Sequence, residues 1–174
     1  LYSKTLASGG FHPLPQFEAP EEPPDGMFRL LMGRAPMHTF GRTTNNRFLS
    51  RVYDENEVWV NADVIAAMPE FASTPPVEGE RVRLINQDGV RSDPIRLKAT
   101  QRIRGDCVYM VHGYGHKAKG LKFAKHRGAS DSDLVTRYKT DPIMGGTGMN
   151  VNFVRLERLA PGESGAEAVA GRAA

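Results

Sequence analysis

Side chains suited to a phosphorylated, base-containing ligand gather in residues 28–46, FRLLMGRAPMHTFGRTTNN. Glycine after an apolar strand lets the backbone approach a ligand closely, and Arg, Thr and Asn offer donors for phosphate and nucleobase edges. An ordinary strand followed by a polar surface loop is an equally good interpretation of this stretch alone. The candidate binding residues here are Gly33, Arg34, His38, Arg42, Thr43, Thr44, Asn45 and Asn46.

A second candidate loop, HGYGH, follows the apolar run of residues 107–111. Two histidines four residues apart suggest a metal site, but the two glycines between them disfavour the helix that such a site needs. The glycines beside Tyr114 instead let the backbone approach a flat ligand while the histidines donate hydrogen bonds. A glycine-rich hairpin that exposes polar side chains is the alternative. The candidates are His112, Gly113, Tyr114, Gly115 and His116.

A third glycine-rich segment, residues 145–150, enters the last predicted strand and contributes the candidate Asn150. If the three loops meet at one rim, they form a polar site with several cations and no carboxylate pair. Such a site suits holding a ligand and does not suit hydrolysing it, so we expect no catalytic residue and no metal ligand in this chain. Neither of the common glycine-rich phosphate-binding motifs is present.

The basic run of residues 117–127, KAKGLKFAKHR, raises the hypothesis of nucleic-acid binding. Only Phe123 interrupts it as an aromatic residue, and the formal net charge of the chain is a mild +3. A solvated basic loop or an anion-attracting rim is the better interpretation, and we expect no nucleic-acid partner. The single cysteine, Cys107, lies in an apolar run and is expected to be buried.

The elements that would position these loops are short strands. A length of 174 residues with 18 glycines and 12 prolines suits one loop-rich domain. Apolar and alternating runs predict a short helix at 62–68, another at 131–139, and six strands near 27–32, 57–61, 81–85, 94–100, 107–111 and 151–156. A mainly β, closed six-stranded barrel with a few short helices and long loops is therefore expected. Residues 27–159 would form it, residues 1–26 would be an extended linker or arm, and residues 160–174 a disordered tail.

The order of these motifs resembles a known family. A strand into GR-x-x-x-H-x-x-x-x-TTNN, then VWVNADVIAAM, EGERVRLINQDG, HGYGH and GTGMN are similar to the C-terminal dinucleotide-binding domain of molybdopterin oxidoreductases of the dimethyl sulfoxide reductase family. Within that family, HGYGH and TTNN look most like the polysulfide, thiosulfate and tetrathionate reductase catalytic subunits. The connection at 68–77 is longer than is usual in the family.

The resemblance implies a double-psi β-barrel that closes over molybdenum bis(molybdopterin guanine dinucleotide). It implies that Gly33 and Arg34 lie along the cofactor, that the polar side chains between His38 and Asn46 supply donors, and that His112–His116 pack against a pterin. Asn150 would complete the grip. Since the molybdenum ligand and the iron–sulfur cysteines of the family lie in earlier domains, this chain would be the end of a catalytic subunit and inactive alone.

The implied partners are the rest of that subunit, an iron–sulfur electron-transfer subunit and a membrane anchor subunit, with a location in the periplasm or on the outer face of the cytoplasmic membrane. The resemblance suggests a sulfur-compound reductase as the whole enzyme. The alternative hypothesis is a non-catalytic structural barrel of a membrane-associated respiratory complex that has lost the cofactor.

Overall fold

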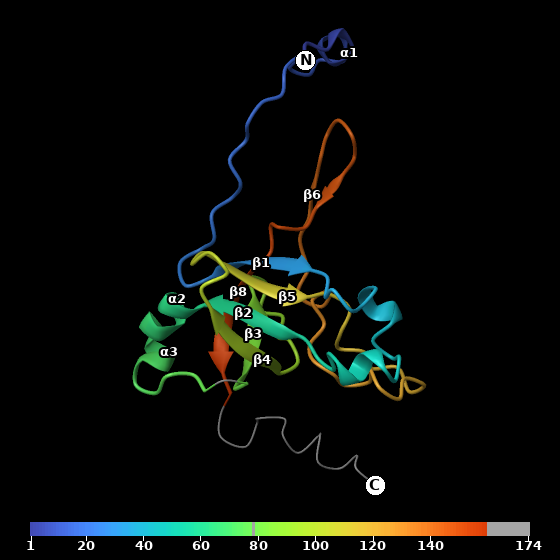
Figure 1. The fold of residues 1–174 in the computed structure, drawn as a ribbon. Coiled ribbons are helices and arrows are strands. Elements are labelled where there is room, and N and C mark those ends of the chain that lie inside the picture. The colour runs from blue at the N-terminus through green and yellow to red at the C-terminus, as the bar shows by residue number, and fades with distance from the viewer. Residues whose placement is uncertain (78, 160–174) are drawn as a thin grey trace.

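Six strands close into a barrel in the computed structural model, which describes residues 1–77 and 79–159 (Figure 1). Around the barrel the strands run in the order β1-β5-β2-β4-β3-β8. They are β1 (Phe28–Gly33), β2 (Glu57–Asn61), β3 (Arg81–Asn86), β4 (Ile95–Thr100), β5 (Cys107–Val111) and β8 (Phe153–Arg158). The predicted mainly β, six-stranded barrel is confirmed, and every predicted strand is found.

Alternation of apolar and polar residues explains why these strands form the barrel. In β2, Val58 and Val60 are fully buried, whereas the residues between and beside them are half-buried. Side chains of a strand point alternately to its two faces, so β2 gives the barrel interior its valines and the outside Glu57 and Trp59. β1 pairs in parallel with β5, and β2 in parallel with β4, while the other neighbours are antiparallel. Two parallel pairs in one closed barrel agree with the double-psi connectivity that the resemblance implied.

The helices are short and lie at one end of the barrel or outside it. α2 (Ala62–Ala67) begins where predicted, because the Asn61 side chain accepts from two of its first backbone N–H groups. α3 (Pro69–Ala72) follows at once, and α1 (Lys4–Ser8) lies near the N-terminus. Two turns of 3₁₀ helix, η1 (Phe40–Arg42) and η2 (Leu49–Arg51), occur in the loop between β1 and β2. Within residues 1–77 and 79–159, no helix is long and apolar enough to cross a membrane.

The helix predicted at 131–139 is wrong. Turns occupy the start of this segment, and it continues into the small strand β6 (Lys139–Thr140), which pairs with β7 (Thr147–Gly148). The Asn152 side-chain oxygen accepts from the backbone N–H groups of Thr136 and Arg137, both at 3.0 Å. Asn152 lies just before β8. Because the two N–H groups donate to its side chain, they cannot donate to backbone carbonyls as they would in an α-helix.

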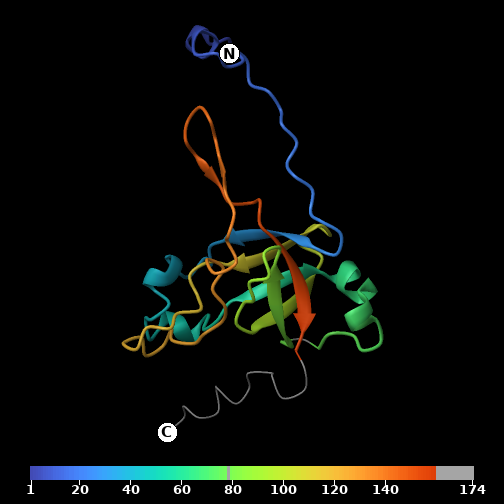
Figure 2. The same ribbon diagram turned by 180° about the vertical axis from the view of Figure 1, so that it is seen from behind.

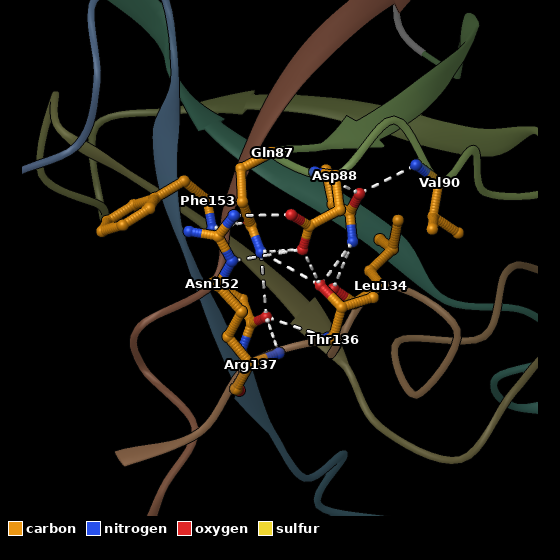
Figure 3. Close-up of polar contacts among 9 residues, drawn as sticks. Gln87, Asp88, Val90, Leu134, Thr136, Arg137, Asn152 and Phe153 are labelled. Carbon is orange, nitrogen blue, oxygen red and sulfur yellow. Dashed lines mark hydrogen bonds and ion pairs between the residues drawn. The ribbon is translucent and has the colours of Figure 1, made fainter.

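Two buried asparagines, Asn86 and Asn152, bind this segment to the barrel. Figure 3 shows Asn152 beside Thr136 and Arg137. Asn86, at the end of β3, donates to the carbonyl of Leu134 at 3.1 Å and to the hydroxyl of Thr136 at 3.0 Å. Asn152 also donates to the carbonyl of Arg137, at 2.7 Å. Both asparagine side chains are almost completely buried, so water cannot reach them. These hydrogen bonds therefore satisfy polar groups that would otherwise have no partner. The network fixes the backbone that leads from residue 131 toward β6.

The arm and the β6–β7 hairpin project from the same side of the barrel in both views (Figures 1 and 2). Glu18 of the arm forms an ion pair with Lys139 of the hairpin at 2.5 Å. Phe17 in the arm is 90% exposed, and Met144 at the hairpin tip is 86% exposed. The boundaries expected at residues 26 and 159 stay predictions, and the expected tail, residues 160–174, lies outside the described residues.

Candidate functional site

The loops after β1 and β5 lie at the end of the barrel opposite α2 and α3 (Figure 1). Two adjoining pockets lie where the predicted loops meet. One has a volume of about 570 Å³ and the other about 400 Å³. They share His112, Asp131 and Ser132, so the three residues lie at their junction. The larger pocket is lined by Met32, Gly33, Arg34, Phe40, His112, Asp131, Ser132, Val135 and Met149. The smaller is lined by Gly41, the whole HGYGH loop, Lys117 and residues 130–133.

The glycines of HGYGH let three backbone segments approach one another. Gly113 has a φ of 95°, and a Cβ atom there would lie 2.4 Å from the backbone nitrogen of Gly41. Gly115 has a φ of 75°, and its Cβ would lie 2.3 Å from the backbone nitrogen of Ser130. Both distances are far inside van der Waals contact, and both φ values disfavour other residues. From the sequence, these glycines were expected to let the backbone approach a ligand. In the structure they let the loops that form the pockets pack against one another, and contact with a ligand stays a prediction.

His112 forms a hydrogen bond with Asp131 at the junction of the two pockets. Its Nδ1–H donates to the Asp131 carboxylate at 2.6 Å. The Asp131 side chain is only 3% exposed, but that of His112 is 39% exposed. Because a carboxylate only accepts, this bond places the hydrogen on Nδ1 and leaves Nε2 for a ligand.

Phe40 and Arg34 line the larger pocket together with His112 and Asp131. The Phe40 ring meets the His112 ring edge-on, with 5.2 Å between centroids, and the Arg34 guanidinium lies 5.3 Å from the Phe40 centroid. Phe40 has a φ of 49°, which is unusual for a bulky residue. Within the described part of the chain, the Arg34 side chain forms no ion pair, so its charge faces solvent and pocket.

The smaller pocket contains a buried ring nitrogen without a partner. His116 Nε2 is shielded from solvent and forms no hydrogen bond to any described residue. The same nitrogen would lie 3.0 Å from a Cβ at Gly41, so the histidine ring packs closely on the first loop. Buried polar atoms are nearly always hydrogen-bonded, which makes this nitrogen a group that a ligand would satisfy. Tyr114 is buried too, and its hydroxyl donates to the Tyr53 carbonyl at 3.3 Å.

The remaining candidates of the first loop bind the protein's own backbone and side chains. His38 is buried, and its Nε2–H donates to the Tyr53 carbonyl at 2.9 Å while Nδ1 contacts the Thr43 hydroxyl at 3.2 Å. Thr44 is buried and donates to the Gly41 carbonyl at 3.0 Å. These side chains therefore shape the loop, and their direct contact with a ligand stays a prediction.

Both asparagines of the TTNN sequence act in the same way. The Asn45 side chain accepts from the backbone of Phe123, and that of Asn46 accepts from the backbone of Phe48, each at 2.9 Å. Arg42 is exposed and lines neither pocket. Asn150 lines another pocket, beside Arg29 and the arm, and its neighbour Met149 reaches the main site instead.

Sequence reasoning missed Asp131, Ser132 and Phe40 as residues of the site. Asp131 and Ser132 lie in a segment expected to be helical. Phe40 is an apolar residue among polar neighbours and was not expected to bind a ligand. A separate expectation holds, since Cys107 is buried and burial raises the pKa of its thiol. In the described residues, no three His, Cys, Asp or Glu side chains gather as metal ligands would.

Two tyrosines under the first loop provide a pH test. Burial raises the pKa of Tyr53 to about 12 and raises the pKa of Tyr114 further. A tyrosine with a raised pKa contributes stability that is complete below its unfolded value of about 10 and is lost as the pH rises above that value. We therefore expect the loop to open cooperatively above pH 10, with a step in tyrosinate absorbance at 295 nm. Tyr114→Phe should reduce that step, and a smooth titration at the ordinary tyrosine pKa in both proteins would contradict the assignment.

Comparison with known proteins gives a likeness of fold. No family model matches the chain. No curated protein matches it in sequence either. The structure is similar to that of acetylene hydratase from Pelobacter acetylenicus, with a TM-score of 0.63 and 15% sequence identity. The match covers 91% of this chain and 23% of that one, so the chain spans about a quarter of the length of acetylene hydratase.

Proposed function

We propose that this chain is the cofactor-binding barrel domain of a molybdenum oxidoreductase. The observation that carries the proposal is the pair of adjoining pockets, which are lined by two histidines, a serine and an arginine that forms no ion pair with any described residue. The likeness of fold to acetylene hydratase supports it, because that protein is a molybdenum enzyme of the dimethyl sulfoxide reductase family. The motif order described above supports the same assignment.

The residues of the site fit a long, flat, phosphorylated cofactor. Arg34 would hold its phosphate groups, since a guanidinium binds phosphate oxygens through charge-assisted hydrogen bonds. His112 Nε2, the unpartnered His116 Nε2 and the Ser132 hydroxyl would hold the polar edges of its rings. Asp131 would keep His112 in one tautomer. When bound, the cofactor supplies the redox chemistry, and this chain binds and orients it.

The finer part of the proposal concerns the whole enzyme. We propose a sulfur-compound reductase that carries molybdenum bis(molybdopterin guanine dinucleotide) and acts with an iron–sulfur subunit and a membrane anchor on the outer side of the cytoplasmic membrane. The motif order alone supports these assignments.

Arg34→Gln should lower the molybdenum and guanine nucleotide content of the purified full-length protein by about tenfold or more. A charge-assisted hydrogen bond contributes about 1.5–3 kcal/mol, and the glutamine keeps a side chain of similar length without the charge. Metal analysis and nucleotide release from the denatured protein measure both contents.

Lys119→Gln is the matched control, because Lys119 is an exposed cation of the basic run outside both pockets. It should leave both contents unchanged. Equal losses in the two variants would mean that the site is misplaced. A wild-type protein purified with neither molybdenum nor pterin would overturn the proposal and favour a structural barrel that has lost its cofactor.

A further inference from the structure

A row of side chains crosses four neighbouring strands on the outside of the barrel. Leu31 of β1 is the register partner of Tyr109 of β5, which is the partner of Trp59 of β2, which is the partner of Lys98 of β4. The Trp59 and Tyr109 rings lie 5.4 Å apart, and the Lys98 ammonium lies 4.9 Å from the Trp59 centroid. Their strand neighbours fill the barrel interior, whereas Tyr109 also packs against a second, smaller apolar cluster that contains Ala35, Val111 and Tyr114.

The row lines a pocket of about 540 Å³ that is distinct from the site described above. The segment after β1 borders it with Ala35, Pro36 and Met37, and the turn after β4 borders it with Arg102 and Ile103. Most of its lining is apolar or aromatic. A concave, largely apolar pocket of this size with a few polar groups is typical of a small-molecule site.

An unsatisfied donor lies in the row. The indole N–H of Trp59 is shielded from solvent and has no acceptor among the described residues. An indole nitrogen can only donate, so the group needs an acceptor that the described part of the chain does not supply. A ligand with an oxygen or nitrogen acceptor would satisfy it, whereas a purely apolar partner would not.

The charges of the pocket are mainly positive. Arg34 and Arg102 line it, and neither forms an ion pair within residues 1–77 and 79–159. Lys98 forms an ion pair with Glu57 at 3.3 Å. Glu57 is the only carboxylate among the described residues that line the pocket. Three cations therefore face one acid, and the surplus charge favours an anion.

We propose that this pocket binds a flat aromatic ligand that carries an anionic group. The aromatic row contacts the ring, Trp59 N–H donates to an acceptor on it, and Arg102 binds the anion. Arg34 lines both this pocket and the proposed cofactor site, so the proposal rests on Arg102 and the aromatic row, which line this pocket alone.

Trp59 is the only tryptophan of the chain, so its fluorescence reports directly on this pocket. The 174-residue chain is titrated with naphthalene-2-sulfonate, with uncharged 2-methylnaphthalene, and with the cationic 2-naphthyltrimethylammonium ion. Calorimetry gives the affinity independently. The expected result is that the sulfonate quenches Trp59 and binds about tenfold more tightly than the uncharged ring, with the cation weakest. Equal affinities for the three probes, or sulfonate binding that leaves Trp59 emission unchanged, would overturn the proposal.

Three variants assign the contacts. Arg102→Gln should weaken sulfonate binding by about tenfold and leave 2-methylnaphthalene unaffected. Trp59→Phe keeps an aromatic ring but loses the donor, and calorimetry should show about fivefold weaker sulfonate binding. Arg155→Gln, on the exposed face of β8 and outside the pocket, is the charge control and should bind like the wild type. Circular dichroism checks that each variant folds, and a loss of the same size in Arg155→Gln would overturn the assignment.

Discussion

Asn152→Ala is expected to lower the free energy of unfolding by about 3–4 kcal/mol, because it removes the hydrogen bonds that a buried side chain makes with four backbone groups. The side-chain oxygen accepts from the Thr136 and Arg137 N–H groups, both at 3.0 Å. The side-chain nitrogen donates to the carbonyls of Arg137 at 2.7 Å and Met149 at 2.8 Å. Asn152 is completely buried, so water does not replace these bonds without a rearrangement (Figure 3). Urea denaturation followed by circular dichroism measures the loss.

Two substitutions control this prediction. Asn150→Ala changes an exposed asparagine two residues away and should have an effect below about 0.5 kcal/mol. Asn152→Asp keeps the accepting oxygen but turns a carboxylate oxygen toward the Arg137 and Met149 carbonyls, so it should be no more stable than the alanine variant. If Asn152→Ala unfolds at the same urea concentration as the wild type, the network does not hold the 134–137 segment.

The barrel could be predicted because its strands obey a local rule. The alternation in β3 and β4 and the apolar run of β5 each arise from residues that are neighbours in sequence. The segment at 131–139 could not be predicted in the same way. Its backbone is fixed by Asn86 and Asn152, which are distant in sequence, and such tertiary hydrogen bonds override local helix preference.

The site was only partly predictable for a similar reason. Arg34 and HGYGH could be recognised as candidates because a cation and paired glycines follow directly after predicted strands, although the structure also gives the two glycines a packing role. The hydrogen-bonding residues Thr44 and Asn45 have both a structural and a binding explanation, and the contacts show the structural one. Asp131 could not be recognised as a site residue from its sequence neighbours. Its role depends on His112, 19 residues earlier, whose Nδ1 the fold brings within 2.6 Å of the Asp131 carboxylate.

Gly113→Ala is expected to destabilise the chain by about 2–6 kcal/mol and to disrupt both pockets of the candidate site. A φ of 95° strains any other residue, at a cost of about 1–3 kcal/mol. The added Cβ would also lie 2.4 Å from the backbone nitrogen of Gly41 and 2.7 Å from the backbone carbon of Phe40. These are backbone atoms that cannot turn away as a side chain would, so the two loops must separate, and overpacking of this kind costs a further 1–3 kcal/mol or so.

The matched control separates the strain from the clash. Gly89, in the turn after β3, has a φ of 82°, but a Cβ there would meet nothing within 4 Å. Gly89→Ala should therefore show the cost of the backbone conformation alone, about 1–2 kcal/mol. The difference between the two variants in urea denaturation measures the energy with which HGYGH packs on the first loop. Equal losses would show that the loops do not touch at Gly113. The proposed role of this contact predicts two results for Gly113→Ala. Its free energy of unfolding should fall by more than that of Gly89→Ala, and the full-length protein should lose molybdenum, because the contact shapes the surface that binds the cofactor.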